Sequence, residues 1–279
     1  MERRHGSVIK GLRAAEQASA AKNRNVSGAR WSMFQSFKTG MASLPEALAA
    51  KLGGSIRKSA DIVAMSRDGA RWRLATSAGD SIEADAVIVA APAYAAARIL
   101  SAVAPRAADL LGKISYASAA TVNLTYKESD FPAPPEAFGF VVPVIERRKI
   151  IAGSFSSLKF DGRAPEGAVL TRAFVGGVLQ TEMMRSSDDE IVAAVRDEFR
   201  TLLAISAPPQ TVDIRRWPDS MPQYEVGHLA RVAEIEKVIA EIPGLAIAGA
   251  AYRGVGIPDC VRSGEQAADE IFDLLASGS

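Results

Sequence analysis

The sequence predicts a mixed α/β (α+β) fold, in which two pieces of an α/β module enclose a second module built on a mixed sheet. Two observations lead to this expectation. Residues 245–272 run from an apolar strand through a glycine-punctuated turn into a helix, and residues 113–225 contain many strand-like segments. A chain of 279 residues is long enough for one large domain or two interleaved domains.

Residues 1–30 predict a helix followed by a polar linker, because helix-forming residues give way to the run Asn23–Gly28. Residues 31–92 form the first piece of the α/β module. They begin with a helix over Glu46–Leu52, for which Ser43 is the expected cap and Pro45 the expected opening residue.

The same piece continues with strands. The pair Asp68-Gly69 is a strong hairpin signal, and the continuously apolar run Ala86–Ala91 is typical of a strand buried on both faces. A helix is expected over Ala93–Leu100. The strand-like segments are Ser55–Arg67, Arg71–Ser77 and Ser81–Ala91.

Residues 93–239 form the second module, and residues 240–279 return to the α/β module. An amphipathic helix is expected over Asp188–Leu203, with a second helix over Leu229–Glu241. The expected strands are Ala119–Tyr126, Gly139–Pro143, Ile150–Phe155, Leu170–Gly176 and Thr211–Trp217.

Composition excludes several classes of function. The chain has 33 basic and 32 acidic residues, so it lacks the positive excess of a nucleic-acid-binding protein. One cysteine excludes an internal disulfide, and with only two histidines no metal site is expected. No apolar run reaches the ~18 residues of a membrane span, and no secretory signal is recognised. We expect a cytoplasmic protein, with peripheral contact at the inner membrane face left open.

The C-terminal stretch is the strongest candidate for a binding site. Gly254 and Gly256 flank Val255, and Pro258 and Asp259 open the helix that follows. We expect the backbone N–H groups of Gly256, Ile257 and Asp259 to point out of the helix end without partners. Such an end attracts an anion or the electron-rich edge of a cofactor. A purely structural strand–turn–helix is the open alternative.

A second constellation combines Trp217 with the segments Pro222-Gln223-Tyr224 and Gly227-His228. Aromatic faces in a proline-stiffened loop suit a flat conjugated ligand, although a packed core corner is the simpler interpretation. His228 precedes a helix, where a capping or solvent-facing role is favoured over catalysis. No catalytic side chain stands out elsewhere.

The tail Gly249–Cys260 resembles the closing signature of the FAD-dependent, oxygen-utilising protoporphyrinogen oxidases, within the wider amine-oxidase-like flavoprotein superfamily. Three further stretches agree in order along the chain. They are Glu2 with His5–Ile9, the segment from Phe37 through Gly40-Met41 to Leu44-Pro45, and Trp217 with Pro222–Tyr224 and Gly227-His228.

The resemblance implies a partial Rossmann-like FAD-binding domain interrupted by a substrate-binding domain, to which residues 1–30 also belong. It implies that Ile62 and Val63 lie where backbone amides hold the adenine, and that Trp217 lies near the flavin. The other FAD contacts that it implies are Gly249, Gly254, Val255, Gly256 and Ile257.

The implied reaction oxidises a porphyrinogen to a porphyrin in haem biosynthesis, with dioxygen as electron acceptor. Protoporphyrinogen and coproporphyrinogen both remain open as substrates. One departure matters: the family opens with a strand, a Gly-x-Gly-x-x-Gly turn and a helix that hold the FAD diphosphate, and this chain contains no such motif.

Without that unit we expect weak or no FAD retention by this chain alone, and apolar strands left without neighbours. A truncated gene, a split protein with a separate N-terminal FAD-binding chain and a mis-called start all remain open. So do two other functions: another amine-oxidase-like flavoprotein, and a non-catalytic fragment.

Overall fold

The computed structural model describes residues 6 and 35–277, so the expected helix within residues 1–30 and the matching stretch at Glu2 and His5–Ile9 fall almost entirely outside the described residues. The chain divides into two units, Met1–Met41 and Ala42–Ser279. In the first unit, Gly40 closes a turn by donating its N–H to the Phe37 carbonyl over 3.0 Å. The remaining description concerns the second unit.

The second unit opens with helix α3 (Ser43–Leu52) and the short 3-10 turn η1 (Gly53–Ser55). Ser43 is the first residue of the helix, and Ala42 stands at the cap without a side-chain hydrogen bond. The expectation that Ser43 caps this helix is therefore wrong, because the helix starts three residues earlier than its apolar spacing indicates.

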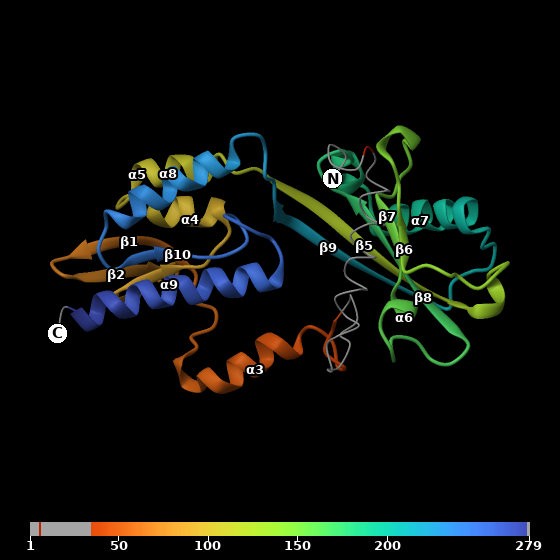
Figure 1. The fold of residues 1–279 in the computed structure, drawn as a ribbon, viewed down its shortest axis with the longest axis horizontal. Helices are drawn as coiled ribbons and strands as arrows, with labels where there is room; N and C mark the ends of the chain where they lie inside the picture. The colour runs from red at the N-terminus through yellow and green to blue at the C-terminus, as the bar shows by residue number, and fades with distance from the viewer. Residues whose placement is uncertain (1–5, 7–34, 278–279) are drawn as a thin grey trace. The chain divides into compact units, whose positions relative to one another are not determined.

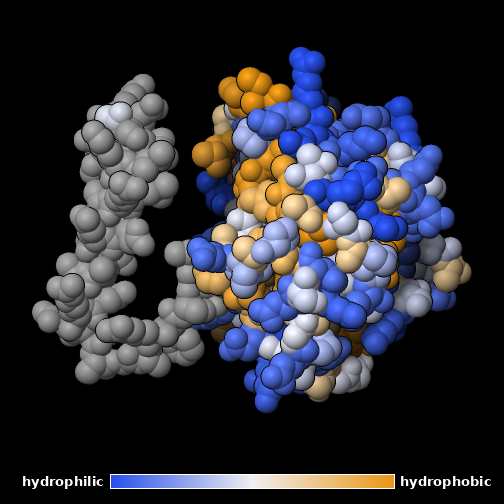
Figure 2. Space-filling model, turned by 90° about the vertical axis from the view of Figure 1, so that its right-hand side faces the viewer, coloured by the Kyte–Doolittle hydropathy of each residue, from blue (hydrophilic) through white to orange (hydrophobic). Residues whose placement is uncertain are grey.

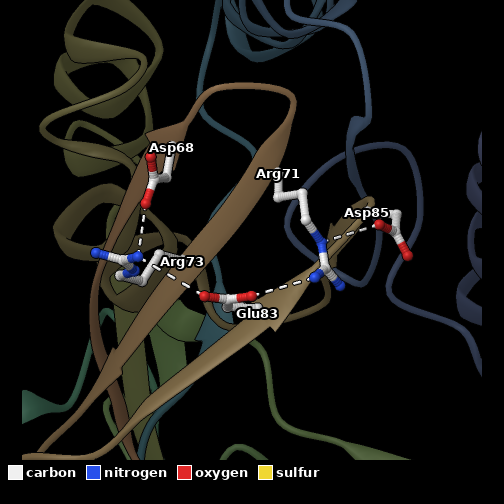
Figure 3. A network of polar contacts seen from close by, with 5 residues as sticks. All are labelled: Asp68, Arg71, Arg73, Glu83 and Asp85. Atoms are coloured by element: carbon white, nitrogen blue, oxygen red, sulfur yellow. Dashed lines mark hydrogen bonds and ion pairs between the residues drawn. The ribbon is translucent and has the colours of Figure 1, made fainter.

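A three-stranded antiparallel sheet follows, made of β1 (Ile62–Asp68), β2 (Arg71–Thr76) and β3 (Ser81–Ala84). The Asp68-Gly69 hairpin is confirmed, with Gly69 at φ 63°. The segment Ser55–Arg67 was too long as a strand, because β1 begins only at Ile62. Arg71 and Arg73 form ion pairs with acidic side chains across this hairpin and the next turn (Figure 3). Their partners are Asp68, Glu83 and Asp85.

The segment Ser81–Ala91 divides between two sheets. After β3, the chain forms β4 (Val87–Val89), which pairs in parallel with β10 (Leu245–Ile247). Ile88 is 38% exposed, so the expectation of a strand buried on both faces is wrong for the described residues. The physical reason is that this parallel sheet has only two strands in the described part of the chain.

Three helices pack with these strands around one core, and a fourth, α9 (Ile257–Ser277), packs through Ala267 and Ile271 on Ala246 and Ala248 in a smaller cluster. The three are α4 (Ala93–Leu100), α5 (Pro105–Gly112) and α8 (His228–Ala240), and Figure 1 shows all four helices near β1, β2 and β10. The expected helix over Ala93–Leu100 is confirmed at both ends. Trp72, Leu100, Leu111 and Ile235 are fully buried in this core. Helices α4, α5 and α8 belong almost entirely to residues 93–239, which the sequence assigned to the second module, yet they share this core with strands of the first module. The expected domain boundaries stay a prediction.

A five-stranded sheet carries the second core. Its strand order is β6 (Gly139–Val141), β7 (Ala152–Phe155), β8 (Ala168–Gly176), β5 (Tyr116–Lys127) and β9 (Thr211–Pro222). All its pairs are antiparallel, so parallel and antiparallel pairing mix in the molecule but not in this sheet. A one-turn helix, α6 (Ser156–Lys159), follows β7, and short 3-10 turns occur at Glu128–Asp130, Val144–Glu146 and Thr181–Arg185.

Helix α7 (Asp188–Leu203) covers one face of this sheet, as Figure 1 shows. Its bounds match the sequence prediction, because a capping box between Ser187 and Glu190 marks the start. Ile191, Val195 and Phe199 are buried against Val122, Leu124 and Val175. The apolar stripe of the sequence is therefore the contact surface of the helix.

Candidate functional site

The candidate site is the turn that connects β10 to α9. Gly249 lies two residues after β10 and has φ 123°, a conformation that residues other than glycine rarely adopt. Its N–H donates to the Ser263 hydroxyl over 3.1 Å, which ties the strand end to the second turn of α9. The strand and the helix are therefore held together at the turn, as the sequence predicts for a strand–turn–helix unit.

The helix end differs from the prediction at one amide. The N–H groups of Asp259 and Cys260 both donate to the Gly256 carbonyl over 3.0 Å. The expectation that the Asp259 amide is free is therefore wrong, because a tight first turn pairs it within the helix. Among the described residues, the amides of Gly256 and Ile257 have no acceptor. Two donors, rather than three, point out of the helix end.

The carboxylate of Asp259 fills the space beside the glycines. A Cβ added to Gly254 would lie 2.5 Å from Asp259 Oδ2, and a Cβ added to Gly256 would lie 3.2 Å from the same oxygen. Arg262 holds this carboxylate by donating to its other oxygen over 2.9 Å. Gly254 is thus required by the protein's own packing. The helix end already has one negative charge near it, which favours a polar ligand edge over a second anion.

Two tyrosines and a histidine lock this turn onto α8. Tyr224 donates its hydroxyl to the Ala250 carbonyl over 2.6 Å, and its ring stacks on His228 with centroids 4.0 Å apart. His228 Nε2 lies 2.8 Å from the Tyr252 carbonyl, so this nitrogen must carry the hydrogen. The residue is 3% exposed, and no side-chain bond caps α8. The expected capping or solvent-facing role of His228 is therefore wrong.

Buried polar atoms remain around this lock. His228 Nδ1 and the Tyr252 hydroxyl have no hydrogen-bond partner among the described residues. Burial raises the pKa of the Tyr252 phenol well above its ordinary value. The pKa of Tyr224 is also raised by burial, although a backbone hydrogen bond at Gly254 opposes the shift. Both phenols stay neutral at physiological pH, so neither is a ready proton acceptor.

A cavity of about 560 Å³ lies between α8, β10 and α9. It is lined by Leu245 and Ile247 of β10, by Gly249 and by Tyr252 of the following turn. Across the β4–β10 pair, the Val87 N–H donates to the Gly244 carbonyl over 2.8 Å and the Ala248 N–H donates to the Val89 carbonyl over 3.1 Å. The remaining lining residues come from α8, the turn and α9: Glu236, Ile239, Ala240, Arg253, Gly254, Asp259, Arg262, Ser263, Gln266, Ala267 and Glu270.

This cavity follows the free edge of β10. Backbone groups of consecutive residues in a parallel strand point to opposite sides, and those of Gly244 and Ala248 point to β4. Those of Leu245 and Ile247 therefore point to the other side. The Leu245 N–H donates to the Ile242 carbonyl over 3.2 Å, whereas the backbone groups of Ile247 have no backbone partner on that side among the described residues. The cavity is thus bordered by unpaired strand backbone.

The other predicted contacts lie elsewhere in the fold. Ile62 and Val63 begin β1. Ile62 pairs with Thr76 and Ala64 pairs with the adjacent Ala75, so Val63 has no partner and forms a bulge. Trp217 lies on β9, is 50% exposed and donates its indole N–H to Thr121 Oγ1 over 3.3 Å. Among the described residues no hydrogen bond joins either group to the β10–α9 turn. Tyr224 is the link between β9 and that turn.

Sequence reasoning missed Ser263 and Tyr252, and it gave the Asp259 side chain only a helix-opening role. The position of Ser263 one helical turn after Asp259 places both on one face of α9, which was the available signal. The part of the chain that the structure describes holds no group of three or more His, Cys, Asp or Glu side chains suited to a metal ion. Its helices include none that is long and apolar enough to cross a membrane.

Comparison with known families decides the relationship. Residues 3–272 match the family model described as flavin containing amine oxidoreductase. The chain belongs to this family. It is 31% identical over 278 residues to a coproporphyrinogen III oxidase of Bacillus subtilis (strain 168), which covers 99% of this chain and 58% of that protein. It is 32% identical over 287 residues to a protoporphyrinogen oxidase of Bos taurus, which covers 97% of this chain and 59% of that protein.

Solved structures agree. A putative protoporphyrinogen oxidase from Exiguobacterium sp. 255-15 superposes with a TM-score of 0.78 at 30% identity, over 97% of this chain and 56% of that chain. A cyclohexylamine oxidase from Brevibacterium oxydans IH-35A has a TM-score of 0.66 at 17% identity, over 85% of this chain and 53% of that chain, which shows the shared fold alone. The chain spans less than three-fifths of the length of these relatives. Family membership implies a flavin cofactor.

Proposed function

We propose that this chain is part of an FAD-dependent oxidase that converts a porphyrinogen to a porphyrin, with dioxygen as the electron acceptor. The observation that carries the proposal is the pair of unpartnered amides at Gly256 and Ile257, at a turn where two glycines lie against the Asp259 carboxylate, in a chain of the flavin-containing amine oxidoreductase family. The chemistry that FAD would supply here is two-electron oxidation, and conversion of a porphyrinogen to a porphyrin takes three such rounds, each removing a hydride and a proton and reducing one dioxygen to hydrogen peroxide.

The chain's own residues would bind and orient the cofactor. Gly256 and Ile257 would donate their amides to the flavin, and Val255 would pack against it because its side chain is 61% exposed. The Gly249 N–H already donates to the Ser263 hydroxyl. Gly249 would therefore contribute only the absence of a side chain, which lets the cofactor approach the backbone closely. Gly254 would leave the room that the Asp259 carboxylate needs beside the turn.

The remaining predicted contacts have local support of different strength. The bulge at Val63 frees a backbone position next to Ile62, which suits hydrogen bonding to an adenine. Trp217 presents half of its surface and suits a flat ring, either flavin or macrocycle. The chain offers no acid–base pair at the turn, which fits a reaction in which the cofactor performs the redox step.

We further propose that an additional polypeptide segment completes the site by adding a parallel strand to the free edge of β10. The cavity there is bordered by Leu245 and Ile247, and Tyr252, whose buried hydroxyl has no hydrogen-bond partner among the described residues, also lines it. An extended apolar segment would pair with the strand backbone. A segment with a Gly-x-Gly-x-x-Gly turn after its strand would also supply the diphosphate anchor that this chain lacks.

The experiment is an anaerobic-to-aerobic oxidation assay. Purified chain and FAD are mixed with coproporphyrinogen or protoporphyrinogen, with and without a separately expressed strand–Gly-x-Gly-x-x-Gly–helix segment, and porphyrin fluorescence is followed above the non-enzymatic rate. We expect porphyrin and hydrogen peroxide in the presence of the segment and little without it. Oxidation of an amine substrate instead would favour another amine-oxidase-like flavoprotein, and no reaction with either would favour a non-catalytic fragment.

A cytoplasmic location with peripheral membrane contact is also proposed. Ile145 and Val144, between β6 and β7, are 86% and 68% exposed, and Leu179 borders the same cavity as Val144. Figure 2 shows strongly hydrophobic residues gathered near the top of one face, with hydrophilic residues beside them. After Glu146 the chain continues with the basic residues Arg147, Arg148 and Lys149. Sedimentation with anionic vesicles, lost on Ile145→Ser, is the expected result.

A further inference from the structure

The face of the five-stranded sheet opposite α7 carries two arginines, Arg172 and Arg215. Residues that face away from α7 alternate with the core residues along each strand. The register aligns them in rows across the sheet. One row is Val141, Ala152, Phe174, Thr121 and Arg215, and the next is Gly139, Ser154, Arg172, Asn123 and Asp213.

This face is distinct from the buried one. Val141, Phe174 and Trp217 take no part in the core that α7 covers, whereas their neighbours Phe140, Val175 and Arg216 face that side. Five of the ten residues in the two rows are glycine, alanine, serine, threonine or valine. Trp217 stands at the border of this face, with its indole N–H donated to Thr121. A partly apolar surface beside an exposed indole suits a planar or saucer-shaped ring.

A chain of hydrogen bonds fixes the arginines. Arg172 donates Nε to Asn123 Oδ1 over 2.7 Å, and Asn123 donates its amide to Asp213 over 3.1 Å. Arg215 forms an ion pair with Asp213 over 3.0 Å through one Nη atom. No described residue accepts from the Nη atoms of Arg172 or from the second Nη of Arg215. Both guanidinium groups are therefore held in place with donors to spare.

The spacing separates the two arginines. Arg172 on β8 and Arg215 on β9 lie two strands apart, in adjacent rows. Strand spacing of ~4.8 Å and a rise of ~3.3 Å per residue put their Cα atoms roughly 12 Å apart. One carboxylate cannot span this distance, whereas two carboxylates on the rim of one large ring can.

We propose that this face binds the porphyrinogen macrocycle, and that Arg172 and Arg215 each take one of its carboxylates while Trp217 contacts the ring. The inference rests on the proposed function, since it assigns the substrate of that same enzyme to a surface. It also makes the two arginines determinants of carboxylate number, because a ring with four carboxylates reaches both arginines in more orientations than a ring with two.

The test is a binding titration of the full chain, followed by tryptophan fluorescence, with coproporphyrin, protoporphyrin and the uncharged tetramethyl ester of coproporphyrin. We expect coproporphyrin to bind most tightly. Arg172→Gln and Arg215→Gln should each weaken its binding about fivefold, as expected for exposed charge pairs, and leave the ester unaffected. Arg172→Lys should retain part of the affinity, because it keeps the charge but not the forked donors.

Arg200→Gln is the matched control, because it removes the same charge from α7, on the covered side of the sheet. If the wild-type chain binds coproporphyrin and the double variant Arg172→Gln/Arg215→Gln binds it equally well, the inference is wrong while the proposed function stands. Equal binding of the acid and the ester by the wild type, or no porphyrin binding, also overturns the inference. Failure of the proposed function shows separately, as absence of porphyrin formation in the oxidation assay.

Discussion

Three glycines of the β10–α9 turn serve different purposes, and alanine substitutions distinguish them. At Gly249 a Cβ would meet no atom within 4 Å, but φ is 123°. Gly249→Ala should therefore lower the free energy of unfolding by about 1–3 kcal/mol through backbone strain. At Gly254 the backbone is permissive, but the Cβ would meet Asp259 Oδ2 at 2.5 Å. Overpacking there should cost about 1–3 kcal/mol.

Gly256 is the informative position. A Cβ there would lie 3.2 Å from Asp259 Oδ2 and 3.7 Å from Pro258 Cδ, and its φ is not positive. A small movement of the carboxylate relieves the first contact, so Gly256→Ala should change the free energy of unfolding by no more than about 0.5 kcal/mol. If the amide of Gly256 faces FAD, the added methyl group should weaken FAD binding by about tenfold, or ~1.4 kcal/mol.

The assays are urea unfolding followed by tryptophan fluorescence and FAD titration followed by quenching of flavin fluorescence. Asp259→Ala in the Gly256→Ala background removes the 3.2 Å contact and serves as the control for carboxylate movement. A Gly256→Ala variant that is as unstable as Gly254→Ala, with unchanged FAD affinity, would refute the reasoning. The glycine would then serve packing alone.

Three further predictions concern the second core. Phe199→Ala should lower the free energy of unfolding by about 3–5 kcal/mol in urea, because the side chain is 1% exposed and leaves a cavity beneath α7. Ser187→Ala should cost about 1 kcal/mol by removing the cap of α7, and Ser187→Asp should retain most of it. Burial raises the pKa of Tyr126 to about 12 from 10.0, so the folded state holds this proton more tightly than the unfolded state. Ionisation of Tyr126 should not change the free energy of unfolding below pH ~10, and should lower it as pH rises from ~10 to ~12. In urea unfolding measured over this pH range, Tyr126→Phe should remove that part of the dependence of the free energy of unfolding on pH. An equal slope in both proteins would contradict the assignment.

Local signals explain where the sequence was informative. The bounds of α7 follow from the Ser187–Glu190 capping box and a clear apolar stripe, and the β1–β2 hairpin follows from Asp68-Gly69. Both depend on residues within a few positions of one another. The error over Ser55–Arg67 has a different origin, because residues 55–61 lie before β1 and have no strand partner among the described residues, which the local sequence does not reveal.

Contacts between distant segments could not be predicted. The stacking of Tyr224 on His228 and the bond from His228 to Tyr252 depend on how α8 meets the turn. The Asp259 amide was placed wrongly because a tight first turn and a free helix end have the same sequence signature. The arginine pair on the open sheet face emerged only from the strand register, which pairs β5 with both β8 and β9.

The most direct test of the account follows the backbone amides of the turn by 15N–1H NMR while FAD is added to the chain. The account predicts that the Gly256 and Ile257 signals move most, that the Gly249 and Asp259 signals move little because their N–H groups are already bonded, and that the shifts grow when the strand-bearing segment is present. Shifts confined to other parts of the molecule, or equal movement of all four amides, would contradict it.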